Sequence, residues 1–171
     1  MKYITVILAI MISSPLFAKN HIGHNTHDFQ RMPHLNGKNT TEVEVEDMRH
    51  MFHRHFEITR EVVYMENGIQ TITRTKNPKL VDALIRHVIM MLDRMENKNN
   101  PEVPIQSPQL DYLFMKSDKI RTGFEALDDG IIVVQTSTNP EVIQSLHKHA
   151  SEVTDMVDRG MQVVHERMMG H

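Results

Sequence analysis

Two stretches of the chain repeat one pattern: a helical spacing of apolar residues, two β-prone runs, and a second helical spacing. Apolar residues three and four positions apart predict an amphipathic helix, and runs rich in β-branched residues bounded by turn residues predict strands. Each stretch is therefore predicted to fold as helix, hairpin and helix. The predicted elements are helices over 48–56 and 108–114, strands over 59–65, 69–75, 122–127 and 131–137, and long helices over 78–97 and from 140 onward.

The short segments between these elements carry turn and capping residues. Asn67-Gly68 and Asp129-Gly130 are dipeptides that reach positive φ at low cost, as a two-residue hairpin turn requires. Asn77 and Asn139 can cap the helices that follow them, and the proline after each lacks an N–H where none is needed. Both hairpins and both long helices therefore have defined starting points.

An offset of 62 residues, which places Asn77 on Asn139, aligns the two stretches without a gap. It matches nine residues between 51 and 97, among them Gly68 with Gly130 and His87 with His149. We interpret the repeat as a duplication. Because a lone hairpin is marginal in water, the two units are predicted to join in an α+β fold, with a pseudo-two-fold, four-stranded antiparallel sheet covered by helices.

The N-terminus has the pattern of a secretory signal peptide. Lys2 precedes a continuous apolar run, and a small residue, Ala18, follows it. The run is too short to span a bilayer, so we expect cleavage, a periplasmic or secreted protein and no stable membrane insertion. The predicted organisation is a signal peptide over 1–18, a mobile His-rich tail over 19–41, a first α-β-β-α unit over 42–97, an exposed linker over 98–107, and a second α-β-β-α unit with a C-terminal helix extension over 108–171.

Composition gives the main functional clue. The chain has 12 His and 14 Met but no Cys and no Trp, and its formal net charge is −3. This charge argues against nucleic-acid binding. The sequence holds no nucleophile elbow, phosphate-binding loop or His-Glu-x-x-His signature, so we predict no catalytic residues. Imidazole and thioether donors without thiols favour a metal-binding function.

The sharpest predicted metal site lies at the new N-terminus. Cleavage after Ala18 would expose Lys19-Asn20-His21, whose amine, two backbone amides and imidazole form the square-planar nitrogen set that Cu(II) prefers. His24 and His27 follow and could add ligands. Alternatively, the segment is a soluble His-rich tail that binds metal adventitiously.

A second predicted site uses the repeated histidines. His87 and His149 each lie on the apolar stripe of a long helix, so a two-fold fold could direct both imidazoles toward one internal space. They could hold haem axially, or a metal ion with help from Met91, Met95 or Met156. The alternative is that each is a core histidine that donates a hydrogen bond to a carbonyl or carboxylate.

Two further clusters are weaker candidates. The first unit opens with His53 and His55, close to His50 and Met51, and His53 aligns with Met115 in the repeat. Thioether and imidazole both bind Cu(I), so this exchange is compatible with a copper site. Methionines also share a face of the last predicted helix, where core packing is the more common role.

The second unit also resembles a known family. Thr136 to Ala150, which follows Asp129-Gly130-Ile131, has the hairpin, the Asn-Pro-x-Val helix start and the His-Ala pair of a family of small secreted bacterial proteins built from two tandem helix-hairpin-helix units. The resemblance spans 51–160 and is weaker in the first unit, where Val88 replaces the alanine after His87. It implies export and duplication, and no particular chemistry.

These observations lead to one functional prediction with two alternatives. The prediction is a periplasmic protein that handles copper as a carrier, buffer or resistance factor, with metal as its ligand and a homodimer or a periplasmic redox or metal-handling protein as its partner. The first alternative is a protein that binds haem non-covalently through His87 and His149, or an electron-transfer partner. The second is a structural or interaction module that holds no ligand.

Overall fold

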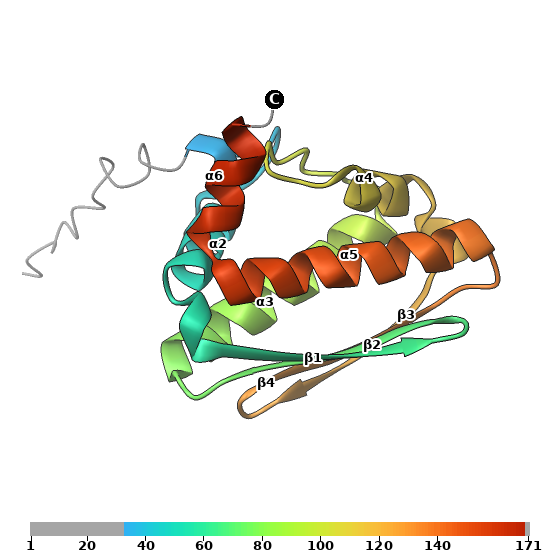
Figure 1. Cartoon of the computed structure of the whole chain (residues 1–171), viewed down its shortest axis with the longest axis horizontal. Coiled ribbons are helices and arrows are strands. Elements are labelled where there is room, and N and C mark those ends of the chain that lie inside the picture. Colours follow the sequence, from blue (N-terminus) through green and yellow to red (C-terminus); the bar gives the residue numbers. More distant parts are fainter. Residues whose placement is uncertain (1–32, 170–171) are drawn as a thin grey trace, which may run out of the picture.

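The computed structural model describes residues 33–169. A four-stranded antiparallel sheet forms one layer and helices form the other, which confirms the predicted α+β fold (Figure 1). In chain order the elements, with η for 3₁₀ helices, are η1 (Pro33–Leu35), α2 (Glu42–His53), η2 (His55–Glu57), β1 (Ile58–Met65), β2 (Gly68–Thr75), α3 (Pro78–Glu96), α4 (Pro108–Met115), η3 (Ser117–Lys119), β3 (Arg121–Leu127), β4 (Gly130–Thr136), α5 (Pro140–Arg159) and α6 (Met161–Met169).

The strand order β1-β2-β4-β3 follows from the duplication. Each unit supplies one antiparallel hairpin, and the second strands of the two hairpins pair with each other at the centre of the sheet. Gly68 pairs with Thr136 at one end of this central seam, and Gly130 pairs with Arg74 at the other. The turn glycines of both units therefore lie where the two units meet.

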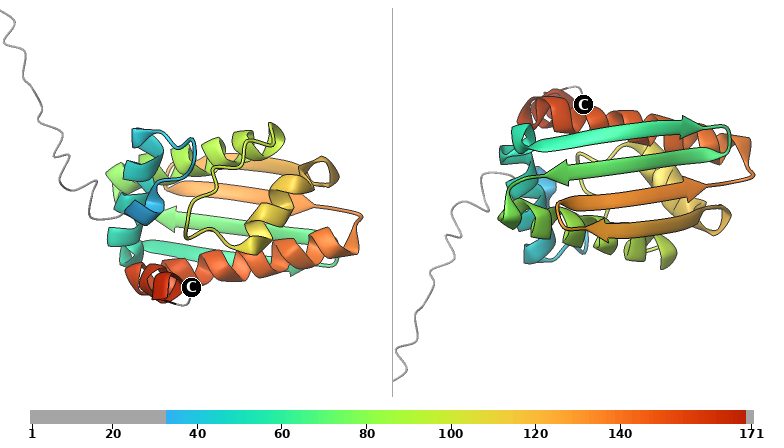
Figure 2. Two further views of the ribbon diagram at one scale, coloured as in Figure 1. Left: turned by 90° about the horizontal axis from the view of Figure 1, so that it is seen from above. Right: turned by 90° about the horizontal axis from the view of Figure 1, so that it is seen from below.

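All the helices lie on one face of the sheet (Figure 2). Helix α5 packs on β1 and β2, α3 packs on β2 and β4, and α2 packs against α3 at one end of the molecule. Helix α4 and the segment before it cross above the sheet between α3 and α5, while no helix of residues 33–169 covers the opposite face of the sheet. No helix between residues 33 and 169 has the length and apolar character needed to cross a membrane.

Helix ends are set by the residues that the sequence indicated. The side-chain oxygen of Asn77 accepts from the backbone N–H of Lys79, and that of Asn139 accepts from Glu141 and Val142, so both asparagines cap their helices. The long C-terminal helix, predicted as continuous from residue 140, ends at Gly160. The φ of Gly160 is +53°, a left-handed value that terminates α5 before α6 begins.

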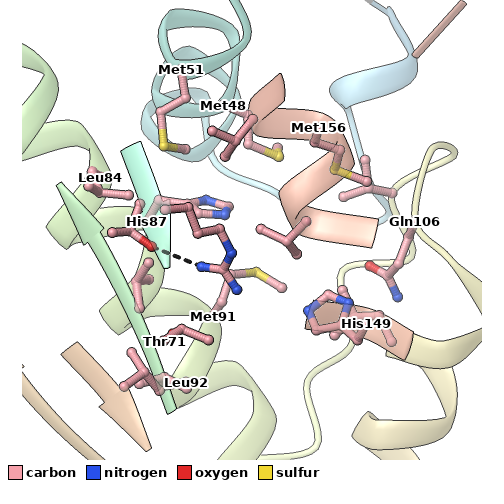
Figure 3. A pocket seen from close by; sticks show the side chains of 18 of the residues that line it. Met48, Met51, Thr71, Leu84, His87, Met91, Leu92, Gln106, His149 and Met156 are labelled. Atoms are coloured by element: carbon pink, nitrogen blue, oxygen red, sulfur yellow. Dashed lines mark hydrogen bonds between the residues drawn. The ribbon is translucent and has the colours of Figure 1, made fainter. Parts of the chain in front are cut away.

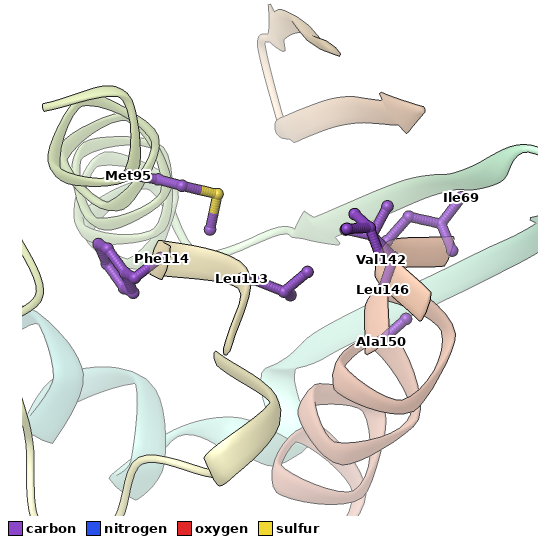
Figure 4. Close-up of a cluster of buried hydrophobic side chains, with 7 residues drawn as sticks. All are labelled: Ile69, Met95, Leu113, Phe114, Val142, Leu146 and Ala150. Atoms are coloured by element: carbon purple, nitrogen blue, oxygen red, sulfur yellow. The ribbon is translucent and has the colours of Figure 1, made fainter. Parts of the chain in front are cut away.

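The largest apolar cluster joins the sheet to α3, α4 and α5 (Figure 4). Leu113, Val142, Leu146 and Ala150 are fully buried within it. Its members are Ile69, Met95, Leu113, Phe114, Val142, Leu146 and Ala150. Burial of apolar area on this scale is the main stabilising contribution to the fold.

Two predictions about connecting segments are wrong. The linker over 98–107 is only partly exposed, because Pro101, Val103 and Ile105 are buried. Part of the expected mobile tail is folded, since Leu35 is fully buried in a cluster with Val45, Val103 and Ile105. Apolar residues in both segments pack against α2 and against each other, which their local sequences did not indicate. The signal peptide and residues 19–32 lie outside the described residues.

Candidate functional site

A cavity of about 280 Å³ lies between the sheet and the helices. Strands β1, β2 and β4 form its floor, α3 and α5 form two walls, α2 closes one end, and residues 101–107 cross above it. Because β3 contributes none of the lining residues, the cavity lies over the β1 edge and the two central strands of the sheet. The two halves of the duplication therefore line one shared space that is partly open to solvent.

Thioether side chains from three helices contribute much of the cavity wall (Figure 3). These methionines are Met48, Met51, Met91, Met95 and Met156. Methionine is flexible and polarisable, so a wall built from it adapts to ligands of different shape. Aliphatic side chains such as Leu84, Val88 and Val133 complete a mostly apolar surface.

Arg60 is a half-buried cation in this apolar setting. It lies on β1, and its Nη1 donates to Oγ1 of Thr73 on the paired strand at 2.8 Å. Its Nε is enclosed and has no hydrogen-bond partner among residues 33–169. Burial lowers the pKa of the Arg60 guanidinium to about 10, against a smaller opposing effect of Tyr64, so the group stays charged at neutral pH. Within residues 33–169 no carboxylate forms an ion pair with it.

The other arginines show how unusual this arrangement is. Six of those in the described part of the chain pair with an aspartate or glutamate: Arg49, Arg54, Arg74, Arg86, Arg94 and Arg159. The most buried of them, Arg94, bonds Glu44 through two nitrogens and also reaches Asn39 and the backbone oxygen of Asn99. A buried cation normally requires such partners, because removing a charge from water is costly.

Three histidines line the cavity: His55, His87 and His149. The Nδ1 of His55 lies 2.7 Å from the backbone oxygen of Val157 and donates to it, because a carbonyl can only accept. This bond fixes the His55 ring against α5, and the ring lies directly over Gly160. His55 therefore helps to close one end of the cavity.

His87 and His149 lie on different walls of the same cavity, as the repeat predicted (Figure 3). Burial lowers the pKa of His87, although Asp47 and Glu44 partly offset this effect, so the imidazole is neutral at pH 7. The Nδ1 of His149 is buried without a hydrogen-bond partner, and the nearby Oε2 of Glu152 is 3.8 Å away. The carboxylate of Glu152 therefore lies beside His149 but beyond hydrogen-bond distance, and the alternative of a core histidine stays a prediction.

The structure separates the remaining predicted metal ligands. His53 is exposed at the end of α2 and does not line the cavity, and the segment that contains His21, His24 and His27 lies outside the described residues. No group of three or more His, Asp or Glu side chains between residues 33 and 169 is arranged to hold a metal ion. Metal binding inside the cavity would therefore depend on imidazoles together with thioethers.

Sequence reasoning missed Arg60 although its position carried a signal. Strand residues alternate between two faces, and Arg60 falls on the same face as Ile58 and Val62. A charged residue at an inward position of an apolar strand face indicates either a buried ion pair or a ligand contact. Gln106, which lies beside His149 in Figure 3, was missed because its segment was predicted to be an exposed linker.

The chain matches no protein-family model, no curated protein and no solved structure. Its resemblance to small secreted proteins with two tandem units stays a prediction.

Proposed function

We propose that this protein binds a small, largely apolar molecule in the cavity between its sheet and its helices. The observation that supports this function is a space lined by methionines and aliphatic side chains, in which the enclosed Nε of Arg60 has no hydrogen-bond partner among the described residues and the enclosed Nδ1 of His149 lies 3.8 Å from the carboxylate of Glu152, beyond hydrogen-bond distance. Buried polar groups in folded proteins are almost always hydrogen-bonded, so such orphans are expected where a ligand supplies the missing contact. Export through the predicted signal peptide would make it an extracytoplasmic carrier or sensor.

The cavity volume limits the size of the ligand. Liquid water occupies about 30 Å³ per molecule, so 280 Å³ corresponds to roughly ten non-hydrogen atoms of liquid density. Octan-1-ol and octanamide are neutral molecules of this size, with one polar end and an apolar chain. A larger ligand would require outward movement of the flexible methionine side chains.

Binding can be followed on the methionines themselves. In protein labelled with ¹³C at the methionine methyl groups, octanamide is expected to shift the NMR signals of cavity residues such as Met91 and Met156. The signals of Met115 and Met169 are the internal reference, because these side chains are 65% and 83% exposed. Replacing Val88, which lines the cavity, with tryptophan fills the space and is expected to weaken binding at least about tenfold.

Ile89→Trp is the matched control for Val88→Trp. Ile89 is the next residue on α3 and is 37% exposed, so a tryptophan there adds the same bulk outside the cavity. The control should bind octanamide like the wild type. If Val88→Trp binds as tightly as Ile89→Trp, or if octanamide moves no cavity methyl in the wild-type protein, the proposed function is wrong.

Copper or haem binding is a second candidate, favoured by the presence of His87, His149 and the thioethers around one cavity. Neutral imidazole and thioether are ligands for Cu(I), and two imidazoles can bind haem iron. The N-terminal copper site predicted at His21 would act independently of this cavity. The two copper sites can be distinguished because they use different residues.

Native mass spectrometry of exported protein tests this second candidate. In a His21→Ala background, one equivalent of Cu(I) is expected to bind and to be lost when His87 and His149 are both replaced by leucine. His53→Ala is the control, since His53 is exposed and outside the cavity. A haem mass or a Soret band that disappears in the double variant would assign haem instead. Retention of the ligand by the double variant would contradict a role for these two histidines.

A further inference from the structure

We infer that the natural ligand is a monoanion, a medium-chain carboxylate whose charged group pairs with Arg60. This inference rests on the proposed function and specifies its ligand class. Three features of the cavity support it: the unpaired donors of the Arg60 guanidinium, the net charge of the cavity wall, and the volume left for an apolar chain.

The guanidinium of Arg60 has unused hydrogen-bonding capacity. Arginine carries five N–H donors. Among the described residues, the Arg60 side chain uses them for one hydrogen bond, to Thr73. Nε is enclosed but unpaired. A carboxylate matches the planar fork of a guanidinium with two parallel hydrogen bonds, so it satisfies the donors and the charge at once.

The charge of the lining residues favours a ligand that carries one negative charge. Glu44 and Arg60 are the formally charged side chains that line the cavity among the described residues, and His87 is neutral at pH 7. Glu44 is already compensated by Arg94 through hydrogen bonds of 2.5 and 2.9 Å. The wall therefore carries one uncompensated positive charge. A phosphate group carries nearly two negative charges, so it would leave uncompensated negative charge in an apolar space.

The rest of the ligand is expected to be an unbranched apolar chain. Beyond Arg60 the lining residues are mainly thioether and aliphatic, and flexible methionines from α2, α3 and α5 tolerate differences in chain length. Octanoate has ten non-hydrogen atoms, which matches the roughly ten that the cavity accommodates. Octanamide has the same size and shape without the charge, so the pair isolates the contribution of Arg60.

The test compares octanoate with octanamide by titration of the ¹³C-methionine protein. We expect octanoate to bind the wild type at least about 30-fold more tightly, the loss usually found when one partner of a buried charge pair is removed. In Arg60→Met this preference should disappear, while octanamide still shifts the cavity methyls. Arg121→Met, which removes an exposed arginine of β3, should retain the preference.

Each contrary result has a separate meaning. If octanamide and octanoate bind the wild type equally, or if Arg60→Met keeps the preference, the carboxylate inference is overturned while the proposed function stands. If acetate binds as tightly as octanoate, the cavity does not hold the chain, and the inference is also overturned. If neither eight-carbon compound moves a cavity methyl, the proposed function itself fails. Arg60→Lys, which keeps the charge without the planar fork, should show an intermediate preference if Arg60→Met does not fold.

Discussion

Replacing Glu44 with glutamine is expected to lower the free energy of unfolding by about 3–5 kcal/mol, because it leaves a buried arginine without its counter-charge. The side chains of Glu44 and Arg94 are 5% and 9% exposed. Glu44 also accepts from the backbone N–H and hydroxyl of Thr41, which completes the capping box of α2. One carboxylate thus ties α2 to α3 and holds the N-terminus of α2. Urea denaturation of both proteins measures the difference.

The same carboxylate makes stability depend on pH. Burial alone would raise the pKa of Glu44, but the hydrogen bonds from Arg94 and Thr41 outweigh it and lower this pKa from 4.5 to about 2. The native state therefore binds the proton less tightly than the unfolded chain. About 3 kcal/mol of stabilisation is fully present above pH 4.5 and is lost as the pH falls toward 2. Glu44→Gln should lack this part of the acid dependence.

Glu46→Gln is the matched control. Glu46 lies on the same helix and pairs with Arg49, but its side chain is 50% exposed. An exposed pair contributes at most about 1 kcal/mol, so this variant should remain close to the wild type and keep the acid dependence. Equal destabilisation by the two substitutions would contradict the role assigned to Glu44.

Gly130→Ala is expected to destabilise the protein by about 3 kcal/mol, at the upper end of the usual effect of overpacking. A Cβ atom at this position would lie 2.0 Å from the backbone oxygen of Thr73, on the other central strand. Backbone atoms cannot rotate away as a side chain can, so β2 and β4 would have to separate. Gly68→Ala should act in the same way, because its Cβ would lie 1.9 Å from the backbone oxygen of Gln135.

Gly123→Ala provides the control for this prediction. Gly123 also lies in a strand, but an added Cβ there meets nothing within 4 Å. Alanine restricts the unfolded chain more than glycine does, so this change should be neutral or stabilise the protein by up to about 1 kcal/mol. Thermal unfolding of the three variants gives the comparison. A Gly130→Ala protein as stable as Gly123→Ala would show that the seam tolerates the added atom.

The repeated pattern of the sequence predicted the sheet and the helices around it. Both hairpins turn directly before Gly68 and Gly130, where the dipeptides Asn67-Gly68 and Asp129-Gly130 predicted turns, but the expected positive φ is present at Gly68 and not at Asn67, Asp129 or Gly130. Asn77 and Asn139 predicted the starts of α3 and α5, because a side-chain cap is a local interaction between residues two or three apart. The alignment of His87 with His149 in the repeat indicated that both could face one internal space, and both line the cavity.

The candidate site was only partly predictable. The histidines and methionines of the cavity were visible as donors on helical stripes, but their spacing does not distinguish a metal site from the wall of a cavity. The absence of a counter-charge for Arg60 could not be read from the chain, since any of its many acidic residues could have been the partner. Which carboxylate meets which arginine depends on contacts between residues far apart in sequence, such as Arg94 with Glu44.

By itself, the sequence determined the local structure: the strands, the turns, the helix caps and the duplicated order of elements, all set by interactions over a few residues. The tertiary structure decided the rest. It placed segment 101–107 over the sheet, buried Leu35 against α2, and left Arg60 charged and without a carboxylate partner among the described residues. These features arise where distant segments compete for the same apolar surface and the same charges, and that competition is settled only when the whole chain packs.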